Sequence, residues 1–203
     1  MKVIAVGRNY IDHANELKNP VPTEPVIFLK PDTALLKENK DFYYPDFSQD
    51  IHYEVEVVLR ICKEGKHIAE KFADKYYDRI GLGIDFTARD IQQKHKEKGL
   101  PWELAKAFDH SAAISNLLPK EGFANAQALN FHLDVNKQRV QTGATKDMIF
   151  SFAKILTFVS KYITLRNGDL IYTGTPAGVG PIQIGDHLEG YLENQKLIDF
   201  RIK

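Results

Sequence analysis

The sequence predicts an α+β fold that is rich in strands. Short apolar stretches of strand length outnumber stretches with helical periodicity, and the two kinds do not alternate regularly along the chain. Glycine turns follow one another closely near the C-terminus, from Gly168 to Gly185. Both observations argue against a doubly wound parallel sheet and against a (β/α)₈ barrel, because those folds need strands and helices in regular succession.

Composition places the chain among one-domain proteins. With 203 residues, 43% of them hydrophobic, it can bury a core without disulfides, and its single cysteine, Cys62, has no partner for one. Lys and Arg number 27 and Asp and Glu also 27, so no basic excess is available to hold nucleic acid or an anionic membrane. No apolar run approaches the roughly 20 residues of a membrane span, and Arg8 interrupts the N-terminal apolar stretch too early for a secretory signal. We therefore expect a cytoplasmic protein with neither nucleic acid nor membrane partners.

The first 30 residues are predicted to hold two strands around a short helical turn. Residues 2–6 are apolar and end at Gly7, and residues 26–29 form a second β-prone run that a Lys-Pro-Asp turn closes. Residues 12–17 have the spacing of a short helix. The stretch 19–25 contains three prolines and is therefore predicted to be a loop.

Three further stretches predict strands. Residues 50–61 form the clearest one, with apolar side chains at the odd positions from 55 to 61. The apolar run 80–84 predicts a buried strand, and residues 129–135 predict another that turns at Asn136-Lys137.

Two stretches predict longer helices. Residues 86–98 form the better one, and we expect Thr87 and Asp90 to make a capping box at its start and Gly99 to end it. Residues 151–163 have helical periodicity as well.

Three carboxylates stand where they can act together. Glu54 and Glu56 are two apart in a predicted strand, so they point to the same side with their Cβ atoms roughly 6–7 Å apart. Asp85 ends the apolar run that precedes the helix. Carboxylates without neighbouring Cys or paired His favour a hard cation such as Mg²⁺ or Mn²⁺. The alternative, which the pattern alone favours, places both glutamates on the solvent face of an amphipathic strand.

Short motifs run through the chain in a set order and spacing. They are Gly7-Arg8-Asn9-Tyr10, Asp12-His13, His52-Tyr53-Glu54-Val55-Glu56, Asp85-Phe86-Thr87-Ala88-Arg89-Asp90, Lys98-Gly99-Leu100-Pro101-Trp102, Leu104-Ala105-Lys106, Asp147-Met148-Ile149-Phe150 and Thr173-Gly174-Thr175-Pro176-Ala177-Gly178-Val179-Gly180. Each motif is weak alone, but together they resemble the fumarylacetoacetate hydrolase family, in its small single-domain acylpyruvase and oxaloacetate decarboxylase branch.

The resemblance covers nearly the whole chain. It implies the mixed β-sandwich or β-roll of that family's C-terminal domain, and a Mg²⁺ or Mn²⁺ ion held by Glu54, Glu56 and Asp85. It also implies one catalytic domain over residues 1–203, in which residues 1–45 supply a strand, a lid helix and a loop and residues 46–203 the metal-binding β-roll. Members of the family usually form homodimers, so we expect a homodimer here.

His13 and Glu16 are candidates for an acid–base pair. They are three apart in a short helical stretch and so share a face. A carboxylate on one ring nitrogen raises the basicity of the histidine, and the other nitrogen can then take a proton from water. By pattern alone such a pair is usually structural. The resemblance implies that it is the family's general-base dyad, on a helix that closes over the site as a lid.

The remaining candidate residues are substrate contacts that the resemblance implies. Lys106, in an otherwise apolar stretch, is grouped with the catalytic residues; by pattern alone it is equally well a lysine that extends past apolar neighbours to water. The substrate-binding set contains two arginines, a glutamine and a tight turn: Arg8, Arg89, Gln92, Gly174 and Thr175. By pattern alone the turn is an ordinary β-turn and Arg89 a surface arginine in an i,i+3 pair.

The resemblance implies chemistry on short oxo acids. The first hypothesis is hydrolysis of 2,4-dioxo acids such as acylpyruvates, or decarboxylation of oxaloacetate, through a pyruvate enolate held by the metal. The second is isomerisation, tautomerisation or hydration of an oxo-diacid, such as oxaloacetate tautomerisation or a hydroxymuconate-type isomerisation. The His13–Glu16 pair favours the first, since activation of water needs a base. A third hypothesis, a binding protein without activity, is disfavoured because every expected metal and base position is filled.

Overall fold

The computed structural model describes residues 1–17 and 20–203, and within them the strands form three sheets. The largest sheet is mixed, with parallel pairs β1–β12 and β3–β8 and antiparallel pairs elsewhere. Its strands in spatial order are β2 (Val26–Lys30), β1 (Val3–Gly7), β12 (Leu170–Tyr172), β5 (Val55–Ile61), β6 (Tyr77–Asp85), β8 (Ala112–Ile114) and β3 (Leu35–Leu36), and β9 (Leu118–Pro119) pairs with β6.

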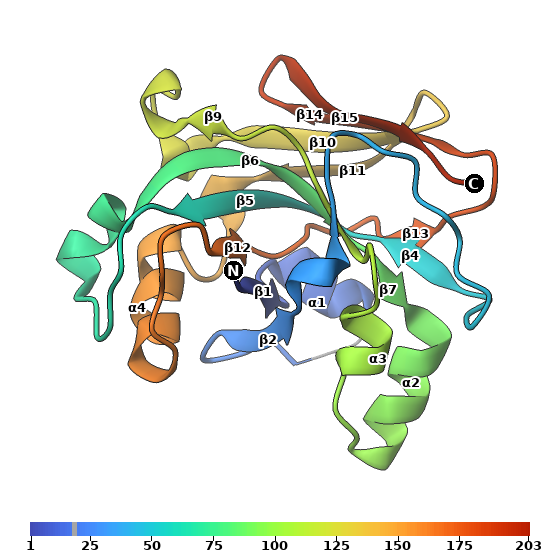
Figure 1. Ribbon diagram of the computed structural model, residues 1–203, viewed down its shortest axis with the longest axis horizontal. Coiled ribbons are helices and arrows are strands. Elements are labelled where there is room, and N and C mark those ends of the chain that lie inside the picture. Colours follow the sequence, from blue (N-terminus) through green and yellow to red (C-terminus); the bar gives the residue numbers. More distant parts are fainter. Residues whose placement is uncertain (18–19) are drawn as a thin grey trace.

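The two smaller sheets are antiparallel. One contains β11 (Gln138–Ala144), β10 (Asn130–Val135), β14 (His187–Leu192) and β15 (Gln195–Arg201), and the other contains β13 (Gly180–Pro181), β4 (Ile51–Tyr53) and β7 (Thr87–Ala88). The four-stranded sheet lies over β5 and β6, as Figure 1 shows. Leu59 and Leu82 of the large sheet share one buried cluster with Phe131, Leu188 and Phe200 of the four-stranded sheet. The architecture is therefore a strand-rich α+β fold of curled, packed sheets.

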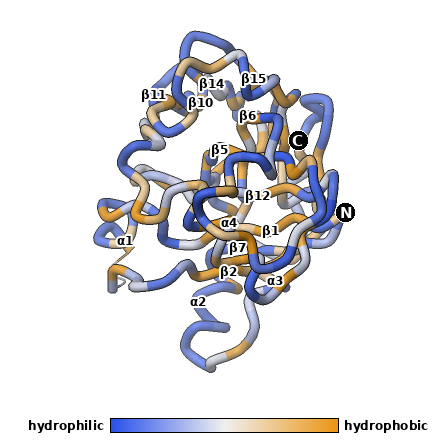
Figure 2. Tube along the Cα trace, turned by 90° about the vertical axis from the view of Figure 1, so that its left-hand side faces the viewer, coloured by the Kyte–Doolittle hydropathy of each residue, from blue (hydrophilic) through white to orange (hydrophobic). Residues whose placement is uncertain are grey.

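Four α-helices and several short 3₁₀ turns complete the described part of the chain. The α-helices are α1 (Ile11–Glu16), α2 (Arg89–Lys98), α3 (Glu103–Lys106) and α4 (Phe152–Tyr162), and the 3₁₀ turns are η1 (Asp32–Ala34), η2 (Glu70–Tyr76), η3 (Lys120–Gly122), η4 (Ala126–Ala128) and η5 (Thr145–Asp147). Helix α4 buries Phe152, Ile155 and Val159 in the core. Helices α2 and α3 project together away from the four-stranded sheet, and α2 is mostly hydrophilic (Figures 1 and 2). None of the helices in residues 1–17 and 20–203 is both long enough and apolar enough to cross a bilayer.

Most predicted elements are confirmed to within a few residues. The strands predicted at 2–6, 26–29, 80–84 and 129–135 and the helices at 12–17 and 151–163 are all present. The turn at Asn136-Lys137 has both residues at positive φ, 51° and 69°, which matches the twist of a tight hairpin. Gly99 ends α2 with φ 64°, as predicted. In the predicted loop 19–25, residues 20–25 contain neither helix nor strand, and Asn19 lies outside the described residues.

Two local predictions are wrong. The strand predicted over 50–61 breaks at Glu54, which separates β4 from β5. The helix predicted from residue 86 begins at Arg89, and Thr87 and Asp90 do not form a capping box. Thr87 lies in β7 and donates its hydroxyl to Glu54, while the Asp90 carboxylate accepts from Ser48 Oγ at 2.7 Å. Tertiary partners thus replace the local cap.

Both faces of β5 are covered, which decides the placement of the glutamates. Val55, Val57, Leu59 and Ile61 lie in the main core, as the alternation predicts, and Val58 of the opposite face lies in a second buried cluster. The alternative that puts Glu54 and Glu56 on a solvent face is therefore wrong.

Candidate active site

The three carboxylates meet at one end of the β5–β6 pair. Glu54 precedes β5, Glu56 is its second residue, and Asp85 is the last residue of β6. The backbone N–H of Asp85 donates to the carbonyl of Glu54 at 2.8 Å, so the antiparallel register holds them opposite one another. One carboxylate oxygen from each residue lies within 4.8 Å of the other two. Their exposed fractions are 5%, 2% and 1%, so the cluster is buried.

Cationic side chains surround two of the three carboxylates. Lys106 Nζ lies 2.8 Å from Glu54 Oε2 and 2.7 Å from Asp85 Oδ2. Arg89 Nη2 lies 2.6 Å from Glu54 Oε1, and Lys30 Nζ lies 2.6 Å from Asp85 Oδ1. Burial by itself raises the pKa of Glu54, but Lys106 and Arg89 outweigh it and hold that pKa well below its usual range. Burial lowers the pKa of Lys106 in turn, but Asp85 and Glu54 outweigh it and raise that pKa overall.

Glu56 has no such cation. Its Oε2 accepts a hydrogen bond of 2.7 Å from the backbone N–H of Gly174, and no Lys, Arg or His in residues 1–17 and 20–203 lies at ion-pair distance from it. Burial raises the pKa of Glu56 well above its usual range, and the charges of Asp85 and Glu54 add to this effect. A divalent cation among these oxygens would supply the missing positive charge. The donor set, three carboxylates without sulfur or imidazole, therefore fits Mg²⁺ or Mn²⁺.

His13 and Glu16 come together on α1. His13 is buried and lines the same cavity as the carboxylates, and its Nδ1 lies 3.4 Å from Glu16 Oε2. Burial lowers the pKa of His13, while Glu54 and Glu16 partly offset this. The imidazole is therefore neutral at pH 7 and can accept a proton. Glu16 also accepts from the backbone N–H of Gly178 at 3.1 Å, which ties the end of α1 to the loop before β13.

Arg89 and Gln92 lie side by side on the first turn of α2. Arg89 Nη1 donates to Gln92 Oε1 at 2.7 Å, and both side chains line the cavity. Because Arg89 also pairs with Glu54, its guanidinium is already engaged with the carboxylate cluster. Its buried Nε has no partner among the described residues. Their contact with a substrate stays a prediction.

The turn at Gly174-Thr175 supports the site from behind. Gly174 has φ 102°, and a Cβ there would lie 2.5 Å from Asn9 Cβ, so only glycine fits. Thr175 lines the cavity, but its hydroxyl donates to the carbonyl of Val55 and accepts from Gln141 Nε2, each at 2.9 Å. The Gly174 N–H and the Thr175 hydroxyl are thus bonded to the protein, and their contact with a ligand stays a prediction.

A second wall of the cavity is aromatic and basic. Phe28 and Trp102 pack with ring centroids 6.1 Å apart, and both line the cavity. The Arg8 guanidinium lies 6.0 Å and Lys96 Nζ 5.9 Å from the Trp102 ring centroid. Burial lowers the pKa of Lys96, and the charges of Arg89, Arg8 and Lys106 lower it further. The carboxylates and this basic wall therefore face one space.

A whole-chain family model matches this architecture. Residues 2–202 match the C-terminal domain of fumarylacetoacetate hydrolase. The chain belongs to the fumarylacetoacetate hydrolase family. A member of this family from Mus musculus, a mitochondrial oxaloacetate tautomerase, is 44% identical over 201 residues, which cover 99% of this chain and 91% of the relative.

Two further members of the family are similar over most of their length. The oxaloacetate tautomerase YcgM of Escherichia coli is 40% identical over 188 residues, which cover 92% of this chain and 86% of the relative. The crystal structure of fumarylpyruvate hydrolase from Pseudomonas aeruginosa, in complex with Mn²⁺ and pyruvate, superposes with a TM-score of 0.95 at 33% identity and covers 100% of this chain and 89% of that chain. Oxaloacetate and fumarylpyruvate are both oxo acids, so these three relatives act on that class of compound.

Several residues of the site could not be found from the sequence. Lys30 is fully buried and donates to both the carbonyl and the hydroxyl of Ser111 at 2.9 and 3.0 Å besides pairing with Asp85. Asn9 is buried and bonds to Phe150 and Thr173, which anchors the start of α1. A lysine at the end of an apolar strand was the one available signal for Lys30. Gln141 lies in β11 and has no motif around it.

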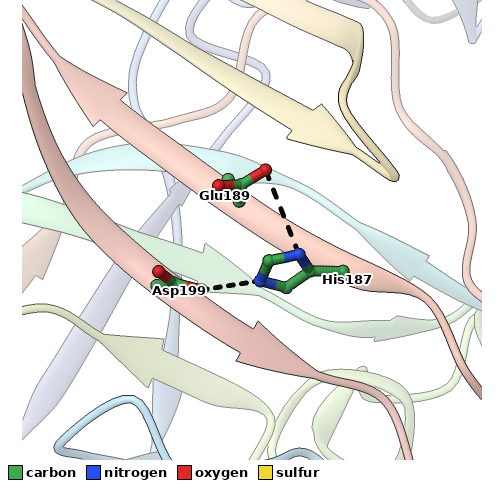
Figure 3. A group of neighbouring side chains, drawn as sticks. All are labelled: His187, Glu189 and Asp199. Atoms are coloured by element: carbon green, nitrogen blue, oxygen red, sulfur yellow. Dashed lines mark hydrogen bonds and ion pairs between the residues drawn. The ribbon is translucent and has the colours of Figure 1, made fainter.

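A second cluster of potential ligands lies on the surface. His187, Glu189 and Asp199 lie on β14 and β15 with ligand atoms within 4.8 Å of one another (Figure 3). His187 Nε2 lies 2.6 Å from Asp199 Oδ1. Lys196 Nζ already bridges the two carboxylates, at 3.0 Å from Glu189 and 2.7 Å from Asp199. The lysine neutralises this cluster in water, so we assign it no site.

Proposed function

We propose that this protein is a metal-dependent enzyme that forms or consumes the enol of a short 2-oxo acid, with oxaloacetate keto–enol tautomerisation as its main reaction. The observation that carries the proposal is one cavity that contains a buried cluster of three carboxylates and a buried histidine. The sequence alone puts C–C cleavage and decarboxylation first. The similarity to two oxaloacetate tautomerases reverses that order.

Glu54, Glu56 and Asp85 are the residues proposed to hold Mg²⁺ or Mn²⁺. A divalent cation bound there supplies a Lewis acid that acidifies the carbon next to the 2-oxo group. Mg²⁺ is the proposed physiological ion, while the similar fumarylpyruvate hydrolase was crystallised with Mn²⁺. The N–H of Gly174 donates a hydrogen bond that keeps Glu56 in place. The hydroxyl of Thr87 donates one that keeps Glu54 in place.

His13 is proposed to move the proton. Tautomerisation of the keto form removes a proton from C3 and adds one to the 2-oxo oxygen. The reverse reaction removes the proton from that oxygen and adds one to C3. A neutral imidazole that lines the cavity suits the first task, and Glu16 on its Nδ1 orients the ring. Lys106 has a raised pKa and stays cationic, so it is proposed to stabilise negative charge that develops on the 2-oxo oxygen. Arg8, Arg89, Gln92, Gly174 and Thr175 remain the proposed substrate contacts.

Cleavage of a 2,4-dioxo acid is the second candidate. The His13–Glu16 pair also suits activation of a water molecule, which would add to the distal carbonyl before the C–C bond breaks and leaves a pyruvate enolate. The fumarylpyruvate hydrolase similarity favours it. Oxaloacetate decarboxylation needs no attacking water and would give the same enolate.

Three broader proposals concern the catalytic unit, the oligomeric state and the location of the protein. Residues 1–203 are proposed to act as one catalytic unit, with residues 1–45 contributing the lid helix α1 to the site that residues 46–203 build. A homodimer and a cytoplasmic location stay proposals; the mouse relative is a mitochondrial protein.

A panel assay tests the proposal. Purified protein with Mg²⁺ is given oxaloacetate in its keto and enol forms, acetylpyruvate, fumarylpyruvate and a hydroxymuconate-type diacid, with ultraviolet absorbance reporting the enol. We expect oxaloacetate interconversion to be fastest, and to be lost with chelator and in Glu56→Gln. Faster turnover of fumarylpyruvate or acetylpyruvate would favour the second candidate, and activity that survives the chelator would refute both.

A further inference from the structure

Among the described residues, Arg8 and Lys96 are cations without an anionic partner. Neither side chain makes a hydrogen bond or an ion pair with any residue in 1–17 or 20–203; their recorded interactions are with the Trp102 ring. Both are half-buried and line the cavity. A cation over an indole gains about 0.5–1 kcal/mol when exposed, and a second cation on the same ring opposes the first. Stacking therefore explains one of these charges more readily than two.

The backbone conformation of Arg8 also favours a functional role for this residue. Arg8 has φ 61°, a left-handed conformation that costs a non-glycine residue on the order of 1–3 kcal/mol and is often found at functional sites. The strain is maintained between Gly7, which packs near Trp102, and Asn9, whose side chain is fixed by Phe150 and Thr173. The fold thus holds the Arg8 side chain at the cavity wall.

The charges that line the cavity indicate the charge of the ligand that would bind there. Four cationic side chains line it, Arg8, Arg89, Lys96 and Lys106, against the three carboxylates Glu54, Glu56 and Asp85. A divalent cation on the carboxylates would leave an excess of positive charge, and Lys30, which pairs with Asp85, adds to that excess. An oxo monocarboxylate carries one negative charge, whereas an oxo dicarboxylate carries two and its enolate three. A dicarboxylate therefore offsets one more positive charge of the wall than a monocarboxylate in the same form does.

We propose that Arg8 and Lys96, which lie 6.0 and 5.9 Å from the centroid of the Trp102 ring, form a subsite for the second carboxylate of a dianionic 2-oxo acid. This inference rests on the proposed function for the head of the substrate and deepens it by assigning two residues to the second carboxylate. The first carboxylate and the 2-oxo group bind at the Glu54–Glu56–Asp85 end of the cavity. The aromatic wall of Phe28 and Trp102 covers the carbon chain between the two ends.

Trp102 offers a direct readout, because it is the only tryptophan in the chain. Mg²⁺-loaded protein is titrated with three ligands, and binding is followed by Trp102 fluorescence and by calorimetry. Oxaloacetate and 2-oxobutyrate have the same four carbons but differ by the second carboxylate. Oxalate reports on the head of the site alone.

We expect Lys96→Gln and Arg8→Gln each to weaken oxaloacetate binding about tenfold to hundredfold, the range for one lost charge-assisted hydrogen bond. Binding of 2-oxobutyrate and oxalate should change by less than about twofold, which is well under 1 kcal/mol. Lys94→Gln is the matched control, because Lys94 is an exposed lysine two residues away on α2. It should leave all three ligands unaffected.

Two results would overturn the subsite. Unchanged oxaloacetate binding in both variants would show that the cations only stack on Trp102. Equal losses for all three ligands would show that they act on the head of the site or on the fold. The proposed function can fail separately from the subsite. Tight, Lys96-dependent binding of oxaloacetate without turnover would support the subsite and refute the activity. Turnover without a preference for the dicarboxylate would support the activity and refute the subsite.

Discussion

Two clusters in this molecule share a lysine that bridges two carboxylates, and they differ in burial. In each, one lysine bridges two carboxylates: Lys106 lies 2.8 and 2.7 Å from Glu54 and Asp85, and Lys196 lies 3.0 and 2.7 Å from Glu189 and Asp199. The first cluster is almost fully buried, whereas Lys196 and Asp199 are 40% and 42% exposed. Water and salt screen the surface cluster, so its ion pairs contribute little. In the buried cluster a charge without a partner is costly, and Glu56 is the one carboxylate of the cluster without a cation among the described residues, so the proposed ion would have its largest effect there.

The largest expected difference concerns the divalent cation. Glu56→Ala should weaken Mg²⁺ binding by more than about a hundredfold, because loss of even an outer partner of a metal ligand costs 10–100-fold. The enzymatic activity should fall with it. Calorimetric titration of Mg²⁺ measures the affinity, and circular dichroism checks the fold. Glu189→Ala is the matched control on the surface cluster and should change neither. Equal Mg²⁺ affinity in Glu56→Ala and the parent would mean that the ion binds elsewhere.

The next expected difference between the two clusters concerns the free energy of unfolding. Without metal, Lys106→Met should destabilise the protein by up to about 3–5 kcal/mol, because Glu54 and Asp85 each lose one of two buried cations and keep only Arg89 and Lys30. Added Mg²⁺ should restore much of the loss, since the ion supplies positive charge at the same oxygens. Denaturant unfolding with and without Mg²⁺ measures both. Lys196→Met should give an unfolding curve that superposes on the parent, with or without the ion. A Lys106→Met protein as stable as the parent would show that the buried lysine is not needed as a counter-ion.

The two histidines that accompany these clusters should differ in their effect on the pH profile. A base must be neutral to act, and burial lowers the pKa of His13 from its ordinary value of 6.5. The kcat/KM profile should therefore be level above pH 6.5 and fall only on the acid side of it. Glu16 raises the pKa of His13, so Glu16→Gln should move the acid limb to still lower pH. His187→Ala should leave the profile unchanged. An acid limb that stays in place in Glu16→Gln would separate Glu16 from the base.

Salt should give the smallest effect. At about 1 M ionic strength the screening length falls to about 3 Å, so the unfolding curves of the parent and Lys196→Met should superpose there as they do at low salt. The difference between the parent and Lys106→Met should persist, because solvent ions do not reach the buried cluster. Paired denaturation curves at low and high salt measure both. A Lys106→Met difference that disappears at high salt would indicate that the cluster is open to solvent.

The local pattern was sufficient for most of the fold. Alternation in residues 50–61 and the apolar run 80–84 located the two central strands, and Gly99 fixed the end of α2. The local sequence pattern gave wrong predictions where a side chain forms its hydrogen bond with a residue far away in the sequence. Thr87 caps no helix because its hydroxyl bonds to Glu54, 33 residues away. The strand breaks at Glu54 next to Val55, whose N–H donates to Gln141, 86 residues away.

The sequence by itself determined which residue types could meet: a glutamate pair at strand spacing, an aspartate at the end of a strand, and a histidine three residues from a glutamate. Only the tertiary structure decided that both faces of β5 are covered, that Lys30 and Lys106 neutralise Asp85 while Glu56 is left without a cation, and that Arg8 and Lys96 share the Trp102 ring. The physical reason is that spacing fixes the direction of a side chain relative to its own strand or helix. Burial and charge compensation depend on which distant segments pack against it.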